Sequence, residues 1–445
     1  MRNLGYVFLV CLVFWALVIF GCCKAFAAAR PNPPMTYYMA TAAQGGSDNN
    51  AGTLAAPFET PAATNRMTLW PGDSVLKKCD GIFGSCQRDT TDIVSSSGVA
   101  DSAIVYGAYG TGAMPVTTAA RHITGWDSVG VNRYRKVKAA PDSVFDVLVR
   151  NVRGTRVMTQ AALDANLEWR NTADTLLVYL TTPADTAFID RSKTTAFTLT
   201  AKSYITINGI RFTHGSGVAA GANCSVALIS GTNATISNCQ IDSSATFGIY
   251  QGCTPGTIKN TIFLNNPTFQ VYSVGDSTRI YNCDLIGGTH GVQQVGTSCV
   301  YKNNIIKDST SKLFFVTPAS KTFTSSNNLF YATSYTNKWM RGSTNFSTFA
   351  SWADSTLQES GSMVADPRFV NASAGDYRLK AGSPATRLGV NLWNSGVRSD
   401  FNGKPYPNNT QRKISAGAYY RKTYTGMGEI GNEIQAEIIS EMRNW

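Results

Sequence analysis

A short phrase recurs between Tyr204 and Tyr331 at a nearly fixed period, and it restricts the fold more than any other feature of the chain. Each copy centres on an asparagine. The spacings of 22, 22, 21 and 24 residues connect Asn238, Asn260, Asn282, Asn303 and Asn327. An upstream copy has Gly209 at the asparagine's position. Self-similarity at a period of about 20–50 residues is typical of a solenoid, in which each repeat packs on its neighbours.

The repeat has the period of strands. Around Gly209, apolar residues alternate at Ile205 and Ile207 and resume at Ile210 and Phe212, which is the period of two that marks a strand. Another short strand follows each asparagine, with aligned members spaced 22, 21 and 22 residues: Ile249, Val271, Val292 and Phe314. Three strands per repeat predict a parallel β-helix, in which successive repeats, or rungs, stack ~4.8 Å apart. An asparagine at a tight bend accepts the left-handed conformation, and its amide bonds to the copies above and below.

The N-terminus reads as a secretory signal. Arg2 precedes an apolar run over 6–20, and Ala25–Ala29 contains a small-residue cleavage site. The run is short for a membrane span and no later stretch is long enough, so we expect no membrane span after cleavage. The protein is then secreted or periplasmic. A lipid anchor through Cys22 is the alternative, although the bulky Phe20 makes a poor lipoprotein box.

The net charge of +11 bears on partners. Between Lys202 and Lys321 there are eight Lys and Arg and only four carboxylates, so the repeat region also carries an excess of positive charge. No basic run or nucleic-acid motif occurs, and we expect no nucleic acid partner. An acidic polysaccharide suits both the charge and an exported protein. We expect a monomer.

Seven of the ten cysteines remain after the expected cleavage. Cys79 and Cys86 lie close together in a glycine-rich loop, and export permits a disulfide between them. Cys239 and Cys283 each follow a repeat asparagine, and we expect them to be buried as small apolar residues. No C-x-x-C pair or His/Cys cluster indicates zinc.

The segment from Tyr37 to Phe83 contains a second set of motifs: Gly46-Ser47-Asp48, Gly52-Thr53, Ala56-Pro57-Phe58 and Pro71-Gly72-Asp73. These motifs, and the segments 103–116, 365–389 and 399–420, resemble those of the right-handed, pectate-lyase-like parallel β-helix superfamily. The resemblance implies that the chain is a secreted, bacterial-type member of it. The resemblance implies a cap over the first rung, which a solenoid needs because its end exposes unpaired backbone and core. These motifs specify architecture and leave the reaction open.

We therefore expect an all-β chain: a right-handed parallel β-helix solenoid with an N-terminal cap, an early-rung β excursion and a short C-terminal helix. Within the excursion, residues 167–180 have the pattern of a β-hairpin. In the C-terminal residues 421–445, apolar residues at every fourth position indicate an amphipathic helix that caps the coil or binds a partner. The expected parts are a signal peptide (1–29), the cap and first rungs (30–125), the excursion (126–200), central rungs with the asparagine ladder (201–335), C-terminal rungs and closing segment (336–420), and the helix (421–445).

In the superfamily, the substrate groove runs over the strand that follows the long turn. The resemblance therefore makes the strands of Ile249, Val271, Val292 and Phe314 the groove floor. Their neighbours should point outward as substrate-binding residues: Tyr250, Tyr272, Gln293 and Phe315, with Gln270. Aromatic side chains offer a flat apolar area on which sugar rings stack. Ordinary β-propensity accounts for Tyr and Phe on an exposed strand equally well.

A uronate lyase needs a cation and a base, and the catalytic candidates are His290, His214 and Lys307. We see no carboxylate cluster for Ca²⁺, so no cofactor is expected and Ca²⁺ is left open. Asp242 and Asp308 lie three rungs apart, ~14 Å, too far for a glycosidase pair.

Two functions remain open at this point. The first is an exported carbohydrate-active protein that binds an anionic polysaccharide and cleaves it by β-elimination, as a polysaccharide lyase does. A glycoside hydrolase is less favoured. The second is a non-catalytic surface or matrix protein that binds glycan or protein.

Overall fold

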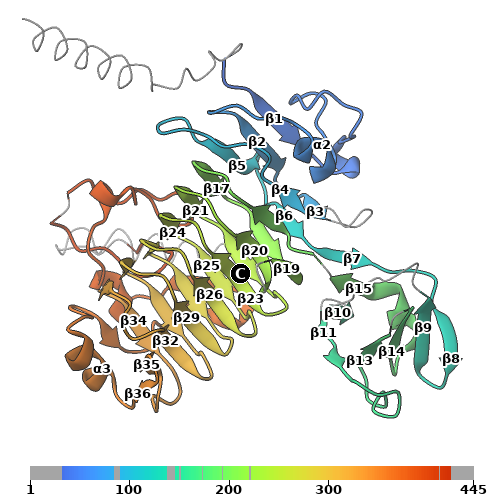
Figure 1. Cartoon of the computed structure of the whole chain (residues 1–445). Coiled ribbons are helices and arrows are strands. Elements are labelled where there is room, and N and C mark those ends of the chain that lie inside the picture. The colour runs from blue at the N-terminus through green and yellow to red at the C-terminus, as the bar shows by residue number, and fades with distance from the viewer. Residues whose placement is uncertain are drawn as a thin grey trace, which may run out of the picture. The chain divides into compact units, whose positions relative to one another are not determined.

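The computed structural model describes residues 33–84, 91–137, 146–149, 152–172, 174–192, 194–219, 222–409 and 411–421. Within them the chain coils as a β-helix of three long sheets, stacked rung on rung (Figure 1). The all-β solenoid is thereby confirmed. The expected signal peptide, Cys22, Cys86 and the C-terminal helix after Arg421 lie outside the described residues, so the Cys79–Cys86 disulfide stays a prediction.

Sheet A holds the strand before each asparagine, and its neighbours all pair in parallel. Its strands are β1 (Thr36–Met39), β2 (Ser74–Lys78), β5 (Ile104–Tyr109), β17 (Ile205–Asn208), β21 (Ala234–Ser237), β24 (Gly256–Lys259), β27 (Arg279–Tyr281), β30 (Cys299–Lys302) and β33 (Phe323–Ser326).

Sheet B holds the strand after each asparagine. Its strands are β3 (Ile82–Gly84), β6 (Val116–Thr118), β18 (Arg211–Thr213), β22 (Gln240–Asp242), β25 (Ile262–Leu264), β28 (Asp284–Ile286), β31 (Ile305–Lys307), β34 (Leu329–Tyr331) and β37 (Met363–Val364). Sheet C completes each turn. Its strands are β4 (Asp92–Ile93), β16 (Phe197–Leu199), β20 (Ala222–Leu228), β23 (Phe247–Gln251), β26 (Phe269–Ser273), β29 (His290–Gln294), β32 (Lys312–Val316), β35 (Trp339–Arg341) and β36 (Thr344–Phe346), with β19 (Gly217–Ala219) beside β20.

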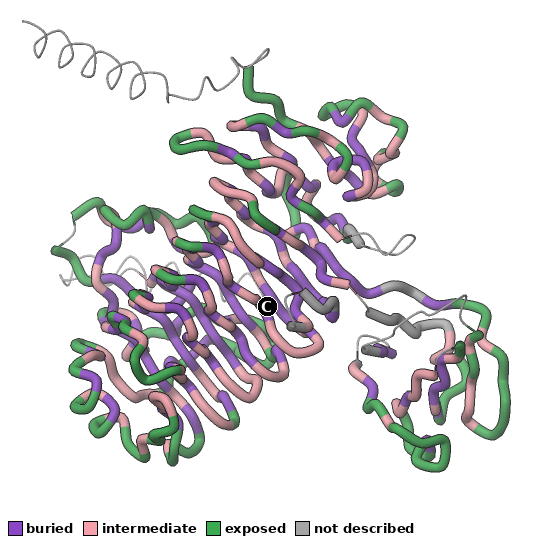
Figure 2. The backbone as a smooth tube through the Cα atoms, viewed as in Figure 1, coloured by how far each residue is buried: buried purple, intermediate pink, exposed green. Residues whose placement is uncertain are grey.

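The core fills the inside of the coil, where alternate residues of all three sheets meet (Figure 2). In sheet A one register row is Ile207, Ile236, Ile258, Ile280 and Tyr301, and each member is at most 1% exposed. Cys239 and Cys283 are fully buried in the same cluster, which confirms them as core residues. Burial raises the pKa of the Cys239 thiol to about 12.

The asparagine ladder forms at the bend between sheets A and B. All five asparagines adopt positive φ, between 48° and 60°. Asn238 donates to Asn208 at 3.1 Å, Asn260 to Asn238 at 3.2 Å, and Asn303 to Asn282 at 3.1 Å. The ladder breaks after Asn260, because the Asn282 amide instead donates to the Tyr406 hydroxyl at 3.1 Å.

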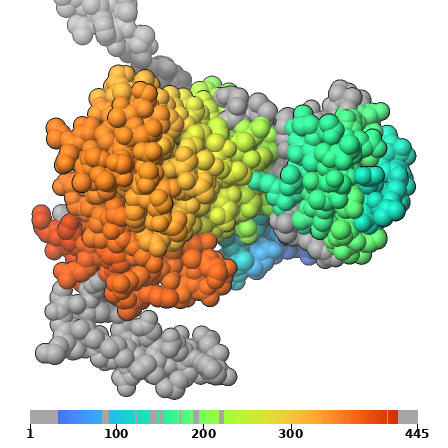
Figure 3. Space-filling view, turned by 90° about the horizontal axis from the view of Figure 1, so that it is seen from below, coloured from blue at the N-terminus to red at the C-terminus, as the bar shows by residue number. Residues whose placement is uncertain are grey.

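That tyrosine belongs to the closing segment, residues 365–421, whose hydrogen bonds place it along the ladder. Figure 3 shows the segment packed against the side of the coil. Asn260 donates to the Ser399 carbonyl at 2.6 Å, and Asn303 donates to the Val390 carbonyl at 2.7 Å. The segment contains β38 (Phe369–Asn371), which pairs antiparallel with β39 (Asp376–Leu379), and the 3₁₀ turns η3 (Ala372–Ala374), η4 (Pro384–Arg387) and η5 (Trp393–Ser395).

An excursion leaves sheet B after β6 and re-enters the coil at β16. It forms two small sheets, and the hairpin expected over 167–180 is present as β13 paired antiparallel with β14. The guanidinium of Arg153 anchors the excursion to the coil through the carbonyls of Ser243 and Ser244, at 2.9 and 2.7 Å. Its elements are β7 (Ala120–His122), β8 (Asp127–Gly130), β9 (Arg133–Val137), β10 (Asp146–Val149), β11 (Val152–Arg153), β12 (Thr155–Arg156), β13 (Glu168–Asn171), β14 (Thr175–Tyr179), η2 (Pro183–Phe188) and β15 (Ile189–Ser192).

Short helices close the two ends of the coil. At the first rung, η1 (Ala42–Gln44) and α2 (Pro61–Asn65) belong to the expected cap, and the Asp48 carboxylate accepts from the backbone of Thr60 at 2.8 Å. At the last rungs, α3 (Phe349–Thr356) buries Trp352 in the core. The Trp352 ring stacks on that of Phe323, with centroids 5.7 Å apart.

Candidate functional site

The outer face of sheet C carries two parallel rows of side chains, one residue from each strand. The strands β23, β26, β29 and β32 pair in parallel and in register. One row contains Phe247, Phe269, His290 and Lys312, and the other contains Tyr250, Tyr272, Gln293 and Phe315. The alternate residues at Ile249, Val271, Val292 and Phe314 are buried in the core, as the repeat predicted.

The rings of these two rows touch one another across the rungs. Phe247 and Phe269 have centroids 5.1 Å apart, and His290 stacks on Phe269 at 4.7 Å. Tyr272 lies 5.7 Å from Tyr250, 5.5 Å from Phe269 and 5.0 Å from Phe247. We call Phe247, Tyr250, Phe269, Tyr272, His290 and Phe315 the aromatic face.

Two members of the aromatic face, Phe247 and Phe269, were not among the residues expected from the sequence. Strict alternation places Phe247 on the same side as Ile249, which is inside. The register has no pair between Gly248 and Gln270, however, and the Phe247 ring lies 5.0 Å from that of Tyr272, outside the coil. Their spacing of 22 residues was a usable signal, since it equals the repeat.

The expectation for Gln270 was wrong in the same way, because strict alternation fails at this end of the strand. Its side chain is fully buried instead of facing outward. Its Oε1 accepts from the amide of Asn266 at 2.7 Å, and its Nε2 donates to the Gly287 carbonyl at 2.8 Å. Gln270 therefore fastens the turn between sheets B and C and does not reach the aromatic face.

His290 lies where the aromatic rings meet two lysines. Burial first, and then the charges of Lys312 and Lys338, lower the pKa of the imidazole to about 4. Its Nδ1 is shielded from solvent and has no hydrogen-bond partner among the described residues. The Lys312 ammonium donates to the Asn337 carbonyl at 2.7 Å and to the Asn345 side chain at 2.6 Å. The imidazole is therefore neutral at pH 7, beside an anchored positive charge.

His214 lies elsewhere, in the turn after β18. Its φ of 59° matches the positive φ of Ser243, Asn265, Gly287 and Asp308 at the end of the later sheet B strands. Its Nδ1 is 3.2 Å from the Thr118 hydroxyl. Burial lowers its pKa to about 4, with the charge of Asp242 acting in the opposite direction.

Asp242, close to His214, is held by several donors. The Arg211 guanidinium contacts both carboxylate oxygens, at 2.7 and 3.0 Å, and the side chains of Thr213 and Gln240 donate at 2.9 and 2.8 Å. Although burial raises the pKa of this carboxyl, the bonds and charge of Arg211 outweigh it and lower the pKa below its ordinary value. Asp242 is an ionised, fully engaged group that anchors this corner.

Lys307 occupies a third position. It is separated from Asp242 by two intervening strands of sheet B, β25 and β28. Its ammonium pairs with Asp308 and lies 4.6 Å from the centre of the Tyr331 ring. The structure thus places the three catalytic candidates at three separate locations, and of these only His290 belongs to the aromatic face.

Two further findings concern ligands and membranes. Within the described ranges, no three His, Cys, Asp or Glu side chains are grouped so that they could hold a metal ion. Among the same residues, no helix is long and apolar enough to cross a membrane.

Residues 192–350 match a family model described as a right-handed β-helix region. Among solved structures, the chain resembles XylC in complex with xylose (14% identity, TM-score 0.55, 69% of this chain and 66% of that one). It also aligns with the GH136 lacto-N-biosidase from Eubacterium ramulus (13%, 0.42, 69% and 55%) and with pectate lyase Pel9A (14%, 0.45, 88% and 97%).

The chain therefore spans 66% and 55% of the lengths of the first two structures. A comparison with curated protein sequences finds no match. At these identities the likeness concerns the fold alone, and together with the family model it confirms a right-handed parallel β-helix.

Proposed function

This chain is a right-handed β-helix protein, and we propose that it binds an acidic polysaccharide across the aromatic face of sheet C. The observation that carries this proposal is the run of touching rings over three successive rungs, from Phe247 and Tyr250 to His290. Rungs repeat every ~4.8 Å, so the rings form an extended platform along the coil. Sugar rings present flat C–H faces that pack on aromatic side chains, and the tyrosine hydroxyls supply hydrogen bonds.

The charge at one end of the platform supports an anionic ligand. Lys312 continues the row of Phe247, Phe269 and His290, and Lys338 lies close enough to lower the pKa of His290. A carboxylate near an ammonium in a partly desolvated site gains a charge-assisted hydrogen bond. Gln293, in the neighbouring row, adds an amide for hydroxyl or carboxylate oxygens. XylC, which shares the fold, was solved with a sugar bound.

Catalysis by β-elimination is the second candidate, favoured by the neutral imidazole of His290. In that reaction a base removes the C5 proton of a uronate, the C4–O bond breaks as a C4–C5 double bond forms, and the leaving oxygen takes up a proton. His290 is the candidate base, Lys312 and Gln293 hold the carboxylate, and Tyr272 is the candidate proton donor. A base with a pKa near 4 is weak at pH 7, so binding without cleavage is the alternative outcome.

Affinity electrophoresis through gels that contain polyuronate tests the binding. The double variant Tyr250→Ala/Tyr272→Ala should lose retention, whereas Trp70→Ala, which removes an exposed aromatic from the N-terminal end, should not. Equal retention of the parent and the double variant would reject the platform. Ultraviolet absorbance of unsaturated uronate, measured with and without a chelator, then tests elimination. Product formation that His290→Asn abolishes supports a lyase, and binding without product supports a non-catalytic binder.

A further inference from the structure

The closing segment carries a concentration of positive charge that the aromatic face does not use. Residues 365–421 contain nine Lys and Arg against three Asp, out of a net +11 for the chain. Eight of the nine cations are exposed, and Arg421 is half-buried. Their positions are Arg368, Arg378, Lys380, Arg387, Arg398, Lys404, Arg412, Lys413 and Arg421.

Two of the three acidic side chains of this segment are held by groups of the segment itself. Asp376 is paired with Arg378 at 2.6 Å. Asp400 is 3% exposed, and its two carboxylate oxygens accept from the backbone N–H groups of Asn402, Lys404 and Tyr420, at 3.0, 2.8 and 2.9 Å. Asp400 thus shapes a loop from inside and offers little to a ligand.

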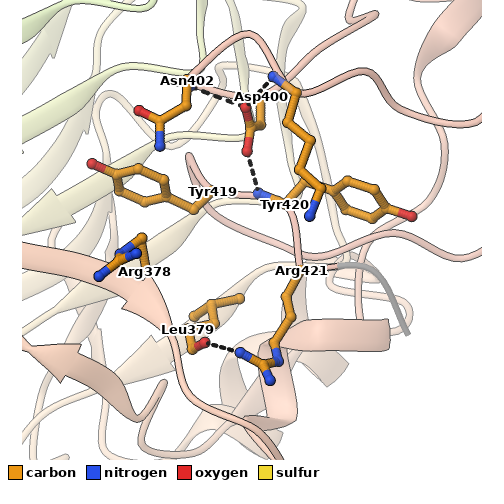
Figure 4. A pocket seen from close by; sticks show the side chains of 8 residues that line it. Arg378, Leu379, Asp400, Asn402, Tyr419, Tyr420 and Arg421 are labelled. Atoms are coloured by element: carbon orange, nitrogen blue, oxygen red, sulfur yellow. Dashed lines mark hydrogen bonds between the residues drawn. The ribbon is translucent and has the colours of Figure 1, made fainter. Parts of the chain in front are cut away.

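That loop forms one wall of a pocket of about 270 Å³, lined by three cations, Arg378, Lys404 and Arg421, and by Tyr419 (Figure 4). Figure 4 shows the side chains of Asn402, Tyr419 and Arg378 on the same side of the pocket, one beneath the other. The Tyr420 ring points the other way and lies 5.5 Å from the Lys404 ammonium. The Arg421 guanidinium donates to the Leu379 carbonyl at 3.2 Å, which holds it at the rim.

We propose that this pocket binds a carboxylate-bearing sugar residue, as a second polysaccharide site separate from the aromatic face. The Tyr419 ring supports the apolar face of the sugar. Asp376 accepts from Nε and Nη2 of Arg378, at 2.9 and 2.6 Å, so a ligand carboxylate meets the remaining N–H groups of that guanidinium. Lys404 adds charge, and the Asn402 amide serves the hydroxyls. The surrounding cations raise the local concentration of an acidic chain. The assignment shares its ligand class with the proposed function, but it rests on different residues.

A second site on the same molecule has a measurable consequence. The pocket is built from β39 and later residues of the closing segment, and the aromatic face is built from sheet C. One long polysaccharide, or two segments of it, can then engage both sites, so that the polymer binds more tightly than a short fragment. Pectate and its short oligomers provide matched probes, with a neutral polysaccharide as the uncharged control.

The test uses the full chain and titration calorimetry with these probes. The variant Arg378→Ala/Lys404→Ala should weaken pectate binding by about tenfold, the loss expected for charge-assisted hydrogen bonds. A matched variant, Arg387→Ala/Arg412→Ala, removes two exposed cations of the same segment outside the pocket and should change it less than about twofold. Equal losses in the two variants would show a diffuse electrostatic effect and overturn the pocket.

Further variants keep the outcomes distinguishable. Tyr419→Ala leaves the charge unchanged and should also weaken binding, and Arg378→Lys should recover only part of it because the fork is lost. Each variant is first compared with the parent by thermal unfolding, and Asn402→Ala replaces any variant that fails to fold. If only Tyr250→Ala/Tyr272→Ala loses binding, the pocket fails and the proposed function stands. If only the pocket variants lose binding, the aromatic face fails instead.

Discussion

Asp284 gives the structure a pH dependence that one substitution should remove. It lies on the outer face of β28, between Ile262 and Ile305 in the register of sheet B, under the closing segment. Its Oδ1 accepts from the backbone of Ala418 at 3.2 Å, and its Oδ2 is buried without a partner among the described residues. Burial raises the pKa of this carboxyl from 3.8 to about 8.

The magnitude follows from the linkage of protonation to folding. Below pH 3.8 Asp284 is protonated in both states, and its contribution to stability is fully present. Between pH 3.8 and about 8 it is ionised when unfolded and protonated when folded, so the free energy of unfolding falls by about 1.4 kcal/mol per pH unit. From pH 5 to pH 8 the loss is about 4 kcal/mol. Above pH 8 it levels off.

Asp284→Asn keeps the shape and removes the titration. Denaturant unfolding of parent and variant at pH 5, 6, 7 and 8 should give a difference in stability that grows with pH in favour of the variant. Asp354→Asn, at an exposed carboxyl of α3, should show no such trend. A parent–variant difference that stays constant between pH 5 and 8 would refute a protonated, desolvated Asp284.

Three other predictions follow from single contacts. Asn303→Ala should destabilise the protein by about 3 kcal/mol, because hydrogen bonds are lost and because alanine tolerates the positive φ less well than asparagine. Limited proteolysis should then cut the closing segment faster, and an unchanged cutting rate would contradict the anchoring role of Asn303. The pKa of Asp242 is lowered, so its pair with Arg211 should stabilise the fold at pH values above the ordinary pKa, and this stabilisation should be lost as pH falls below about 4. Acid unfolding of Asp242→Asn should lack this pH dependence. Nuclear magnetic resonance of His290 should show a neutral ring down to pH 5; titration near pH 6.5 would contradict its burial.

Much of the coil was predictable because a stacked solenoid repeats one local rule. An asparagine every 21 to 24 residues marks the same bend in each rung, and alternation on either side decides which residues face the core. Ile249 and Val271 are buried and Tyr250 and Tyr272 face outward for that reason alone. The cap motifs were equally readable, since Asp48 serves neighbouring backbone groups.

The candidate site was only partly predictable, because it depends on departures from the rule. At the start of β26, Gln270 is fully buried, while Phe269 packs its nearly buried ring against Tyr272 and His290 on the outside of the sheet. Strict alternation predicts the opposite for both residues. His214 and His290 looked alike as histidines beside turns. They differ because one occupies a bend at positive φ and the other begins a strand beside Phe269 and Lys312.

By itself the sequence determined the rung, since spacing and alternation are local properties that each repeat satisfies with its nearest neighbours. Only the tertiary structure decided what covers the rungs. The closing segment binds asparagines that lie more than 60 residues earlier in the chain, as the contacts of Asn327 with Leu388 and of Asn303 with Val390 show. Such contacts follow from the path of the whole chain. They bury Asp284 beneath Ala418 and gather Arg378 and Tyr419 into one pocket.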